Sequence, residues 1–229
     1  WIDDPAALKK ELDTAGIRYD SVHIARAAWD LAAEDKDQRR AAIDAGLASL
    51  QQCAELGARV VVTHPNRDKI EYKEGTRERD CAWTRDALTV LADEARNLGL
   101  KLALENMSSH NPARLATTIT EVQEFIAPHR DVMGICLDTG HTHASGLNLT
   151  EEIRAAGADL LNIHIHDNHG QSDEHLRPGR GTIDWDAFLS ALQDIDYQGL
   201  LTFEIVAKGL PLGMLNYVQR LQREWGAQL

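Results

Sequence analysis

Short apolar runs alternate with longer amphipathic stretches along almost the whole chain. The apolar runs are rich in Val, Ile and Leu and show little strict alternation, which is typical of strands covered on both faces in a parallel sheet. The pattern predicts six strands, at residues 17–24, 58–64, 100–106, 132–138, 160–167 and 200–206.

The stretches between these strands have the 3.6-residue period of helices. Gly16, Gly57 and Gly99 follow three of them, where a left-handed helix cap is expected. The pattern predicts helices over 5–15, 38–56, 76–98, 113–127, 150–156, 184–195 and 212–226. Repeated alternation of strand and helix is typical of a parallel α/β fold. Because no linker or shift of composition interrupts it, residues 1–229 are expected to form a single domain.

Nearly every predicted strand ends in, or close to, a side chain that binds metal ions. In a doubly wound sheet such strand ends lie along a line, whereas in a (β/α)8 barrel they form a ring around the active site. One histidine or carboxylate at a strand end is usually a solvated terminus, but repetition at six strands needs another explanation and favours a (β/α)8 TIM barrel. The six residues are His23, His64, Glu105, Asp138, His164 and Glu204.

The loops after two of these strands add further imidazoles and carboxylates. His141 lies three residues beyond Asp138, and Asp173 and His175 follow the fifth strand. Imidazoles and carboxylates together suit Zn²⁺, Mn²⁺, Co²⁺ or Fe²⁺. The chain has three cysteines and no CxxC pair, which disfavours a cysteine-based zinc site. An all-oxygen Ca²⁺ site would not use this many histidines.

Five motifs in this order resemble the xylose isomerase-like TIM barrel superfamily. They are LALEN (102–106), CLDTGH (136–141), HIHD (164–167), DEHLRPGRGTIDW (173–185) and TFEI (202–205). The superfamily includes sugar and sugar-phosphate isomerases and epimerases, inosose-processing enzymes and abasic-site nucleases of the endonuclease IV type. The resemblance covers about residues 17–206. It implies a (β/α)8 barrel whose first strand-helix unit, ahead of His23, is lacking or not recognised in this chain, as in a truncated protein.

The resemblance also implies a set of metal ligands. In isomerases and epimerases of this family, one divalent ion (Zn, Mn, Co, Fe or Mg) is held at the positions of Glu105, Asp138, His164 and Glu204. The nuclease branch holds three zinc ions with nine ligands. The further matching positions are His23, His64, His141, Asp173 and His175. One metal ion is therefore expected, and up to three are compatible with the ligand set.

The favoured hypothesis is a metal-dependent isomerase or epimerase of a small sugar, sugar phosphate or inosose. Glu105 and Glu204 would remove and return a proton next to a carbonyl, and His141 would contact a substrate oxygen. His64 is expected to bind substrate. Arg177 and Arg180 would bind an anionic substrate, or else be solvated loop residues.

Two other hypotheses stay open. The complete nine-residue set is compatible with an endonuclease IV-like phosphoester hydrolase that has a multinuclear zinc site. The third hypothesis is a non-catalytic barrel that binds a sugar or a metal ion. Within the fifth strand and its loop, His166 and His169 are expected to orient neighbours or face solvent, and Asp167 to fix an imidazole tautomer.

Charge and composition restrict the partners. The net charge of −12 disfavours nucleic acid and anionic lipid. The family resemblance implies a small-molecule carbohydrate as the partner. No apolar run approaches the ~20 residues that span a bilayer, and the first residues do not resemble a signal peptide. The odd, widely spaced cysteines suit a reducing cytoplasm. The sequence does not indicate an oligomeric state.

Overall fold

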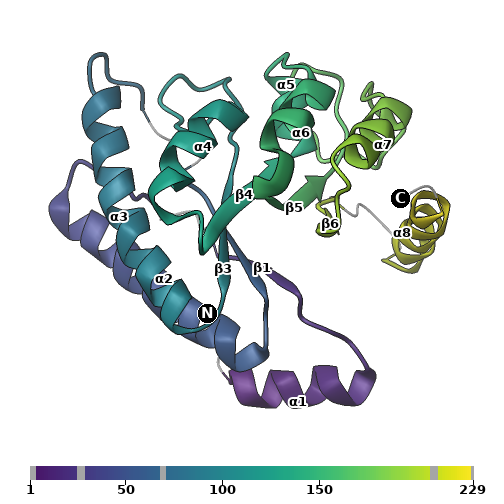
Figure 1. The fold of residues 1–229 in the computed structure, drawn as a ribbon, viewed down its shortest axis with the longest axis horizontal. Helices are drawn as coiled ribbons and strands as arrows, with labels where there is room; N and C mark the ends of the chain where they lie inside the picture. Colours follow the sequence, from purple (N-terminus) through teal and green to yellow (C-terminus); the bar gives the residue numbers. More distant parts are fainter. Residues whose placement is uncertain (1–3, 25–28, 68–70, 207–210, 228–229) are drawn as a thin grey trace.

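The structure is a computed structural model that describes residues 4–24, 29–67, 71–206 and 211–227. Within these ranges, six parallel strands form one sheet in the order β1-β2-β3-β4-β5-β6. Helices cover the outer face of the curved sheet (Figure 1). The strands are β1 (Ser21–His23), β2 (Val60–Thr63), β3 (Lys101–Glu105), β4 (Met133–Asp138), β5 (Leu160–Ile165) and β6 (Leu200–Phe203). All six were predicted, and each is shorter than its apolar run.

The helices follow the predicted alternation with strands. Gly16 and Gly57 end the first two in the left-handed conformation, as expected. In the described ranges, no helix is both long enough and apolar enough to cross a membrane. The helices are α1 (Pro5–Ala15), α2 (Lys36–Leu56), α3 (Arg77–Asn97), α4 (Ile119–Ile126), α5 (Thr139–Ala144), α6 (Leu149–Ala156), α7 (Trp185–Asp194) and α8 (Pro211–Gly226), with 3-10 turns η1 (Ala127–His129) and η2 (Gly157–Asp159).

Two helices differ from the sequence prediction. The helix predicted over 113–127 begins only at Ile119, because the Thr118 side chain accepts the N–H of Glu121 as an N-cap. The short helix α5 was not predicted at all. It begins directly after β4, where the Asp138 carboxylate accepts the N–H of His141. The same carboxylate that ends a strand therefore also begins a helix.

Side chains from distant strands meet inside the curved sheet. In a flat sheet of this order, β1 and β5 would be separated by about 19 Å, since neighbouring strands lie ~4.8 Å apart. Instead, Asn162 of β5 donates to the hydroxyl of Ser21 in β1 over 3.2 Å. The rings of His23 and His164 lie 5.4 Å apart between centroids. The sheet therefore has the curvature of a TIM barrel, as the sequence predicts.

The two faces of the sheet carry different side chains. The main core lies between sheet and helices, and strand residues such as Val61, Leu102 and Ile163 contribute to it. The barrel interior holds a small apolar cluster of Val60, Val62, Ala103 and Cys136. Above this cluster, toward the carboxyl ends of the strands, the inward positions become histidines and carboxylates. The fold thus directs the polar residues predicted at strand ends into one enclosed space.

Asp167 clamps the long loop after β5. It is fully buried, and its carboxylate accepts the N–H of Gly179 at 2.8 Å, the N–H of Ile183 at 3.2 Å and the indole N–H of Trp185 at 3.1 Å. The backbone of Asp167 also pairs with that of Leu176 in an isolated bridge. Asp167 was expected to fix an imidazole tautomer; the hydrogen bonds of its carboxylate instead hold the loop.

Replacing Asp167 by alanine is expected to lower the free energy of unfolding by about 3 kcal/mol or more, because buried N–H donors lose a charged acceptor. Denaturation with guanidinium chloride measures this loss. Asp4→Ala is the matched control: Asp4 caps exposed α1 through the N–H of Ala7, and its removal should cost only about 1 kcal/mol. Equal losses for the two variants would contradict the proposed clamp.

Candidate metal centre

The strand register places the predicted residues at neighbouring strand ends. Asp138 in β4 is paired with His164 in β5, and Glu105 in β3 is paired with Cys136 in β4. His23 ends β1, His64 follows β2, and Glu204 follows β6. Because parallel strands bring their carboxyl ends to one edge, these six side chains converge at one mouth of the barrel.

The centre of the cluster is formed by two glutamates and one histidine. Nδ1 of His164 lies 3.3 Å from Oε2 of Glu105 and 3.0 Å from Oε2 of Glu204. Asp138 completes a group in which one ligand atom from each of the four residues lies within 4.8 Å of the others. These are the four positions that the family resemblance indicated for a single divalent ion. The Glu204 side chain is 37% exposed, against 1% for Glu105.

His23 and His64 lie on one side of this group. Nε2 of His23 is 3.1 Å from Nε2 of His64, within hydrogen-bond distance, and the ring tautomers decide which nitrogen donates. Both nitrogens approach Oε2 of Glu105, at 3.4 Å and 3.3 Å. His23, His64 and Glu105 therefore form a second group with ligand atoms within 4.8 Å of one another. His64 is held in place by Trp29, whose indole N–H donates to its carbonyl at 3.0 Å.

A third group lies on the other side of Asp138. Nε2 of His175 is 3.2 Å and Nε2 of His141 is 3.3 Å from Oδ2 of Asp173. The structure adds His166, whose Nδ1 is 3.6 Å from Oδ1 of Asp173. His166, Asp173 and His175 have ligand atoms within 4.8 Å of one another. All nine predicted residues therefore lie in one connected cluster.

His166 was missed as a site residue by the sequence reasoning. It is fully buried, and its Nε2 lies 3.0 Å from Oδ2 of Asp138. Its ring stacks on that of His175, with centroids 4.1 Å apart. Strand alternation was the available signal, since residues i and i+2 share a face and His164 points inward. His169, by contrast, is exposed on the loop, as expected, and its Nδ1 lies 2.9 Å from Oε2 of Glu174.

Four buried polar atoms in the cluster make no hydrogen bond within the described residues. They are Oε2 of Glu105, Nδ1 of His164, Nδ1 of His166 and Oε2 of Glu204. Buried polar atoms are normally paired, and leaving one unpaired costs about 1–3 kcal/mol. Three of these atoms belong to the central group, whereas His166 belongs to the group with Asp173 and His175. A divalent cation in each group would satisfy them, and imidazole with carboxylate is a donor set that such ions prefer. The residues therefore fit a metal ion.

Electrostatic coupling shifts several pKa values within the cluster. Burial by itself raises the pKa of Glu105, but nearby His164 and His64 outweigh it and hold that pKa well below its ordinary value. Burial lowers the pKa of His141, whereas Asp138 and Asp173 raise it to a net value of about 10. A hydrogen bond to Asp173 raises the pKa of His175 to about 9. Without a metal ion, the carboxylates therefore retain protons on these histidines.

The sequence from residue 1 to residue 225 matches the family model described as xylose isomerase-like TIM barrel. The chain is a member of this family. It is 31% identical over 165 residues to an inosose isomerase of Bacillus subtilis (68% of this chain). It is 27% identical over 195 residues to a probable endonuclease 4 of Thermoplasma acidophilum (80% of this chain). The chain spans only 57% and 65% of the lengths of these two relatives.

Solved structures of this barrel family agree with the observed fold. A D-tagatose 3-epimerase-like protein superimposes with a TM-score of 0.85 at 23% identity, over 96% of this chain and 81% of the other. The IOLI protein, described with a bound zinc atom, has a TM-score of 0.76 at 27% identity, over 90% of this chain and 73% of the other. The first likeness supports the barrel architecture alone. The IOLI protein shows that a barrel of this fold can bind a zinc atom.

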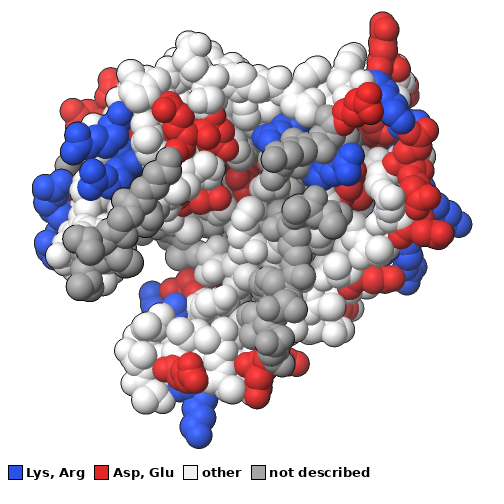
Figure 2. Space-filling view, turned by 180° about the vertical axis from the view of Figure 1, so that it is seen from behind, with Lys and Arg blue, Asp and Glu red and all other residues white. Residues whose placement is uncertain are grey.

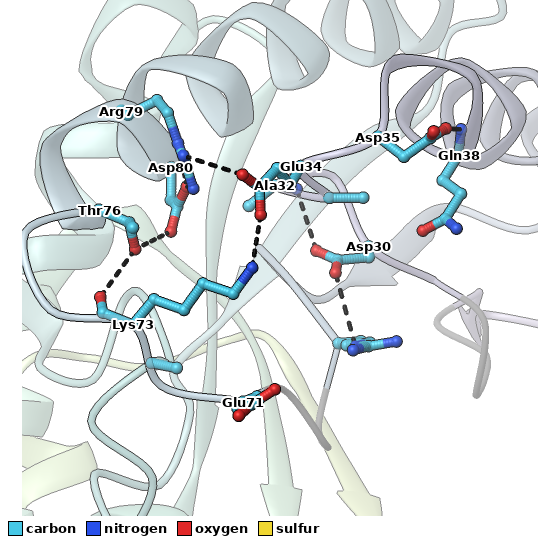
Figure 3. A pocket seen from close by; sticks show the side chains of 13 residues that line it. Asp30, Ala32, Glu34, Asp35, Gln38, Glu71, Lys73, Thr76, Arg79 and Asp80 are labelled. Carbon is cyan, nitrogen blue, oxygen red and sulfur yellow. Dashed lines mark hydrogen bonds and ion pairs between the residues drawn. The ribbon is translucent and has the colours of Figure 1, made fainter.

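A polar cavity of about 540 Å³ lies near the same mouth of the xylose isomerase-like barrel. It is formed by loop residues 30–35, the segment that follows β2, and the start of α3 (Figure 3). The three cations among its described lining residues are all paired: Lys73 with Glu34 at 2.6 Å, Arg79 with Asp80 at 2.9 Å, and Arg67 with buried Asp30 at 3.6 Å. These pairs explain the cavity's charged walls without a ligand.

Arg177 and Arg180, predicted to bind an anionic substrate, lie on the loop that Asp167 clamps. They line a different cavity, beside α8, of about 700 Å³. The described residues lining this cavity include none of the histidine and carboxylate cluster. Substrate binding by these arginines stays a prediction.

The free energy of unfolding of the metal-free protein is expected to fall as the pH rises from about 6.5 to 10. The raised pKa values of His141 and His175 stabilise the fold below the unfolded value near 6.5, and this stabilisation is lost as pH passes about 9 and 10. Discounted for solvent screening, the loss is about 2 kcal/mol, or roughly 4–8 °C in Tm. Thermal melting in the presence of chelator measures this loss of stability.

A Zn²⁺-loaded sample should lose less stability over the same pH range, because the ion replaces the protons on these histidines. An equal loss with and without Zn²⁺ would contradict this prediction.

Proposed function

We propose that this chain is a divalent-metal-dependent isomerase or epimerase of a small sugar, sugar phosphate or inosose. The observation that carries the proposal is the group of Glu105, Asp138, His164 and Glu204, whose ligand atoms lie within 4.8 Å of one another. Two buried carboxylate oxygens of this group make no hydrogen bond to the described residues. The likeness to an inosose isomerase supports the same class of reaction.

The metal ligands are Glu105, Asp138, His164 and Glu204. A divalent ion bound there supplies Lewis acidity toward a carbonyl and its adjacent hydroxyl. The protein supplies the enclosure: Glu105, Asp138 and His164 are each at most 3% exposed, so water is largely excluded from their side of the site. Exclusion of water strengthens every charge interaction with a bound substrate.

Glu204 and Glu105 divide the proton transfer between them. They approach His164 from β6 and β3, so a substrate carbon placed between them has a carboxylate on each side. Glu204 is the more accessible of the two, which suits it to remove the proton from an entering substrate. Glu105 returns a proton from the other side, which inverts the carbon or moves the carbonyl.

His141 positions the substrate through its Nε2. Its Nδ1–H donates to the carbonyl oxygen of Asn106 over 2.9 Å, which fixes the ring and directs Nε2 toward Asp173. A substrate oxygen near Nε2 would form a hydrogen bond with a ring whose orientation is fixed. His64, beside Glu105 on the opposite side, would contact the remaining hydroxyls.

A second candidate function has its own supporting observation. The groups His23–His64–Glu105 and His166–Asp173–His175 flank the central one, so the cluster has donors for two further ions. Multinuclear sites of this kind suit phosphoester hydrolysis, and the likeness to a probable endonuclease 4 supports it. The net charge of −12 opposes a DNA substrate.

Elemental analysis of protein purified without added metal or chelator distinguishes the two functions. One ion per chain, lost in Glu105→Gln and retained in Asp173→Asn, is the expected result. It should be accompanied by exchange of substrate hydrogen with solvent deuterium in ketoses or inososes. Two or three ions, with the extra ones lost in Asp173→Asn, would favour the hydrolase. Absence of metal under every loading condition would overturn both functions and leave a non-catalytic binding barrel.

A further inference from the structure

The cavity beside α8 is lined by positive charge. The described residues on its wall carry four guanidinium groups and no carboxylate. α8 lies at the right edge of Figure 1 and so at the left edge of Figure 2, where Lys and Arg side chains gather. In a chain with a net charge of −12, this concentration of cations is unusual. The four residues are Arg177, Arg180, Arg220 and Arg223.

These guanidinium groups are largely without counter-ions. Arg220 approaches Glu224 at 3.7 Å, with both side chains more than half exposed, which is a weak pair. Within the described ranges, no carboxylate pairs with Arg177, Arg180 or Arg223. The cavity of Figure 3 differs in this respect, because each cation among its described lining residues faces an acid. The four arginines therefore repel one another unless an anion lies between them.

The loop that carries two of the arginines is held firmly. The N–H of Arg180 donates to the carbonyl of Arg177 at 3.0 Å, which closes a turn. Gly179 in this turn has φ +76° and donates its N–H to the buried Asp167 carboxylate. The Tyr217 hydroxyl of α8 donates to the carbonyl of Pro178. The turn is thus fixed both to the barrel and to the helix that carries the other two arginines.

Tyr217 also organises the guanidinium groups themselves. Arg177 and Arg220 lie over its ring, 5.1 Å and 5.4 Å from the centroid. Such stacking restricts their motion while leaving their N–H donors free. Several N–H donors, positioned before any ligand arrives, are suited to a compact anion with several acceptor oxygens. Phosphate is the anion that fits this description.

We propose that the cavity formed by loop 177–180 and α8 binds a phosphate group. The site is separate from the metal cluster, and the proposal does not depend on the proposed isomerase function. It nevertheless lies close to that cluster: Arg177 is two residues from His175, which limits the distance between their Cα atoms to less than about 8 Å. His175 in turn donates from Nδ1 to the carbonyl of Glu204 at 2.9 Å. The phosphate belongs either to the substrate or to a free anion.

Calorimetric titration of chelator-treated protein with inorganic phosphate at low ionic strength tests the proposal. Chelation removes the metal ion as a competing site for phosphate. Arg177→Gln combined with Arg180→Gln is expected to weaken phosphate binding at least tenfold. Arg18→Gln combined with Arg59→Gln is the matched control, because it removes the same charge near Asp20 and should change the affinity less than twofold. Circular dichroism melting confirms that each variant is folded.

Three results would overturn the site: no phosphate binding by the unchanged protein, equal loss in both double variants, or no loss in the Arg177–Arg180 variant. A further arm identifies the source of the phosphate. Tighter binding of a pentose 5-phosphate than of inorganic phosphate, with the difference lost on chelation, would assign it to the substrate. Equal binding of both, unaffected by metal, would assign it to a free anion. Either outcome is independent of whether isomerase activity is found.

Discussion

Replacing Glu204 by glutamine is expected to lower the rate of solvent hydrogen exchange in the substrate by about 10³-fold or more. Glutamine has nearly the same shape but cannot accept a proton, so the variant lacks the carboxylate that we propose as the base. The loss should appear in kcat at saturating metal concentration, since a ligand defect alone would be reduced by added metal. Deuterium incorporation followed by NMR, together with the metal content per chain, measures both quantities.

Glu151→Gln is the matched control for this experiment. Glu151 lies in the first turn of α6 and is exposed, so the same chemical change there should leave the exchange rate within twofold. Glu105→Gln is expected to differ from Glu204→Gln. Glu105 belongs both to the central group and to the group with His23 and His64, so this variant should lose most of the bound metal. Retention of full exchange by a metal-loaded Glu204→Gln protein would eliminate Glu204 as the base.

Gly140→Ala is expected to destabilise the protein by about 2–3 kcal/mol, which corresponds to roughly 5–10 °C in Tm. A Cβ at Gly140 would overlap the ring of His166. That ring has little freedom to move, because it stacks on His175 and contacts Asp138 at 3.0 Å. The displacement should also weaken binding of any ion held by His166, Asp173 and His175. Thermal melting and metal titration test the two effects separately.

The control for this change is Gly213→Ala. Gly213 lies in the first turn of α8, and a Cβ there would meet no atom of the described residues within 4 Å. Alanine favours a helix over glycine, so this variant should be as stable as the parent protein or gain up to about 1 kcal/mol. If Gly140→Ala were as stable as Gly213→Ala, the close contact between Gly140 and the His166 ring would not limit the residue at position 140.

The sequence allowed prediction of the barrel and of most of the cluster because both follow local rules. Apolar runs define the strands, and parallel strands necessarily bring their carboxyl ends together. The convergence of Glu105 and Glu204, nearly a hundred residues apart in the chain, follows from this geometry alone. The helices were located almost as well, since their caps, such as Gly16 and Gly57, are encoded within a few residues.

The features that escaped prediction depend on tertiary contacts. The helix α5 forms because the Asp138 side chain turns back onto the following backbone, which no period in the sequence reveals. The burial of His166 depends on the space that Gly140 leaves for its ring. The arginine cluster joins a loop to a helix about 40 residues further along the chain. Spacing in the sequence contains no information about such an encounter.

The distribution of the central ligand group along the chain has a consequence for folding kinetics. Its residues are spread from Glu105 to Glu204, and His23 extends the cluster to β1, the first described strand. Such long-range closures form slowly, because most of the chain must be ordered before any of them is made. An ion that binds only the assembled cluster would then mainly lower the rate of unfolding. Added Zn²⁺ should accordingly slow unfolding and leave the rate of refolding nearly unchanged.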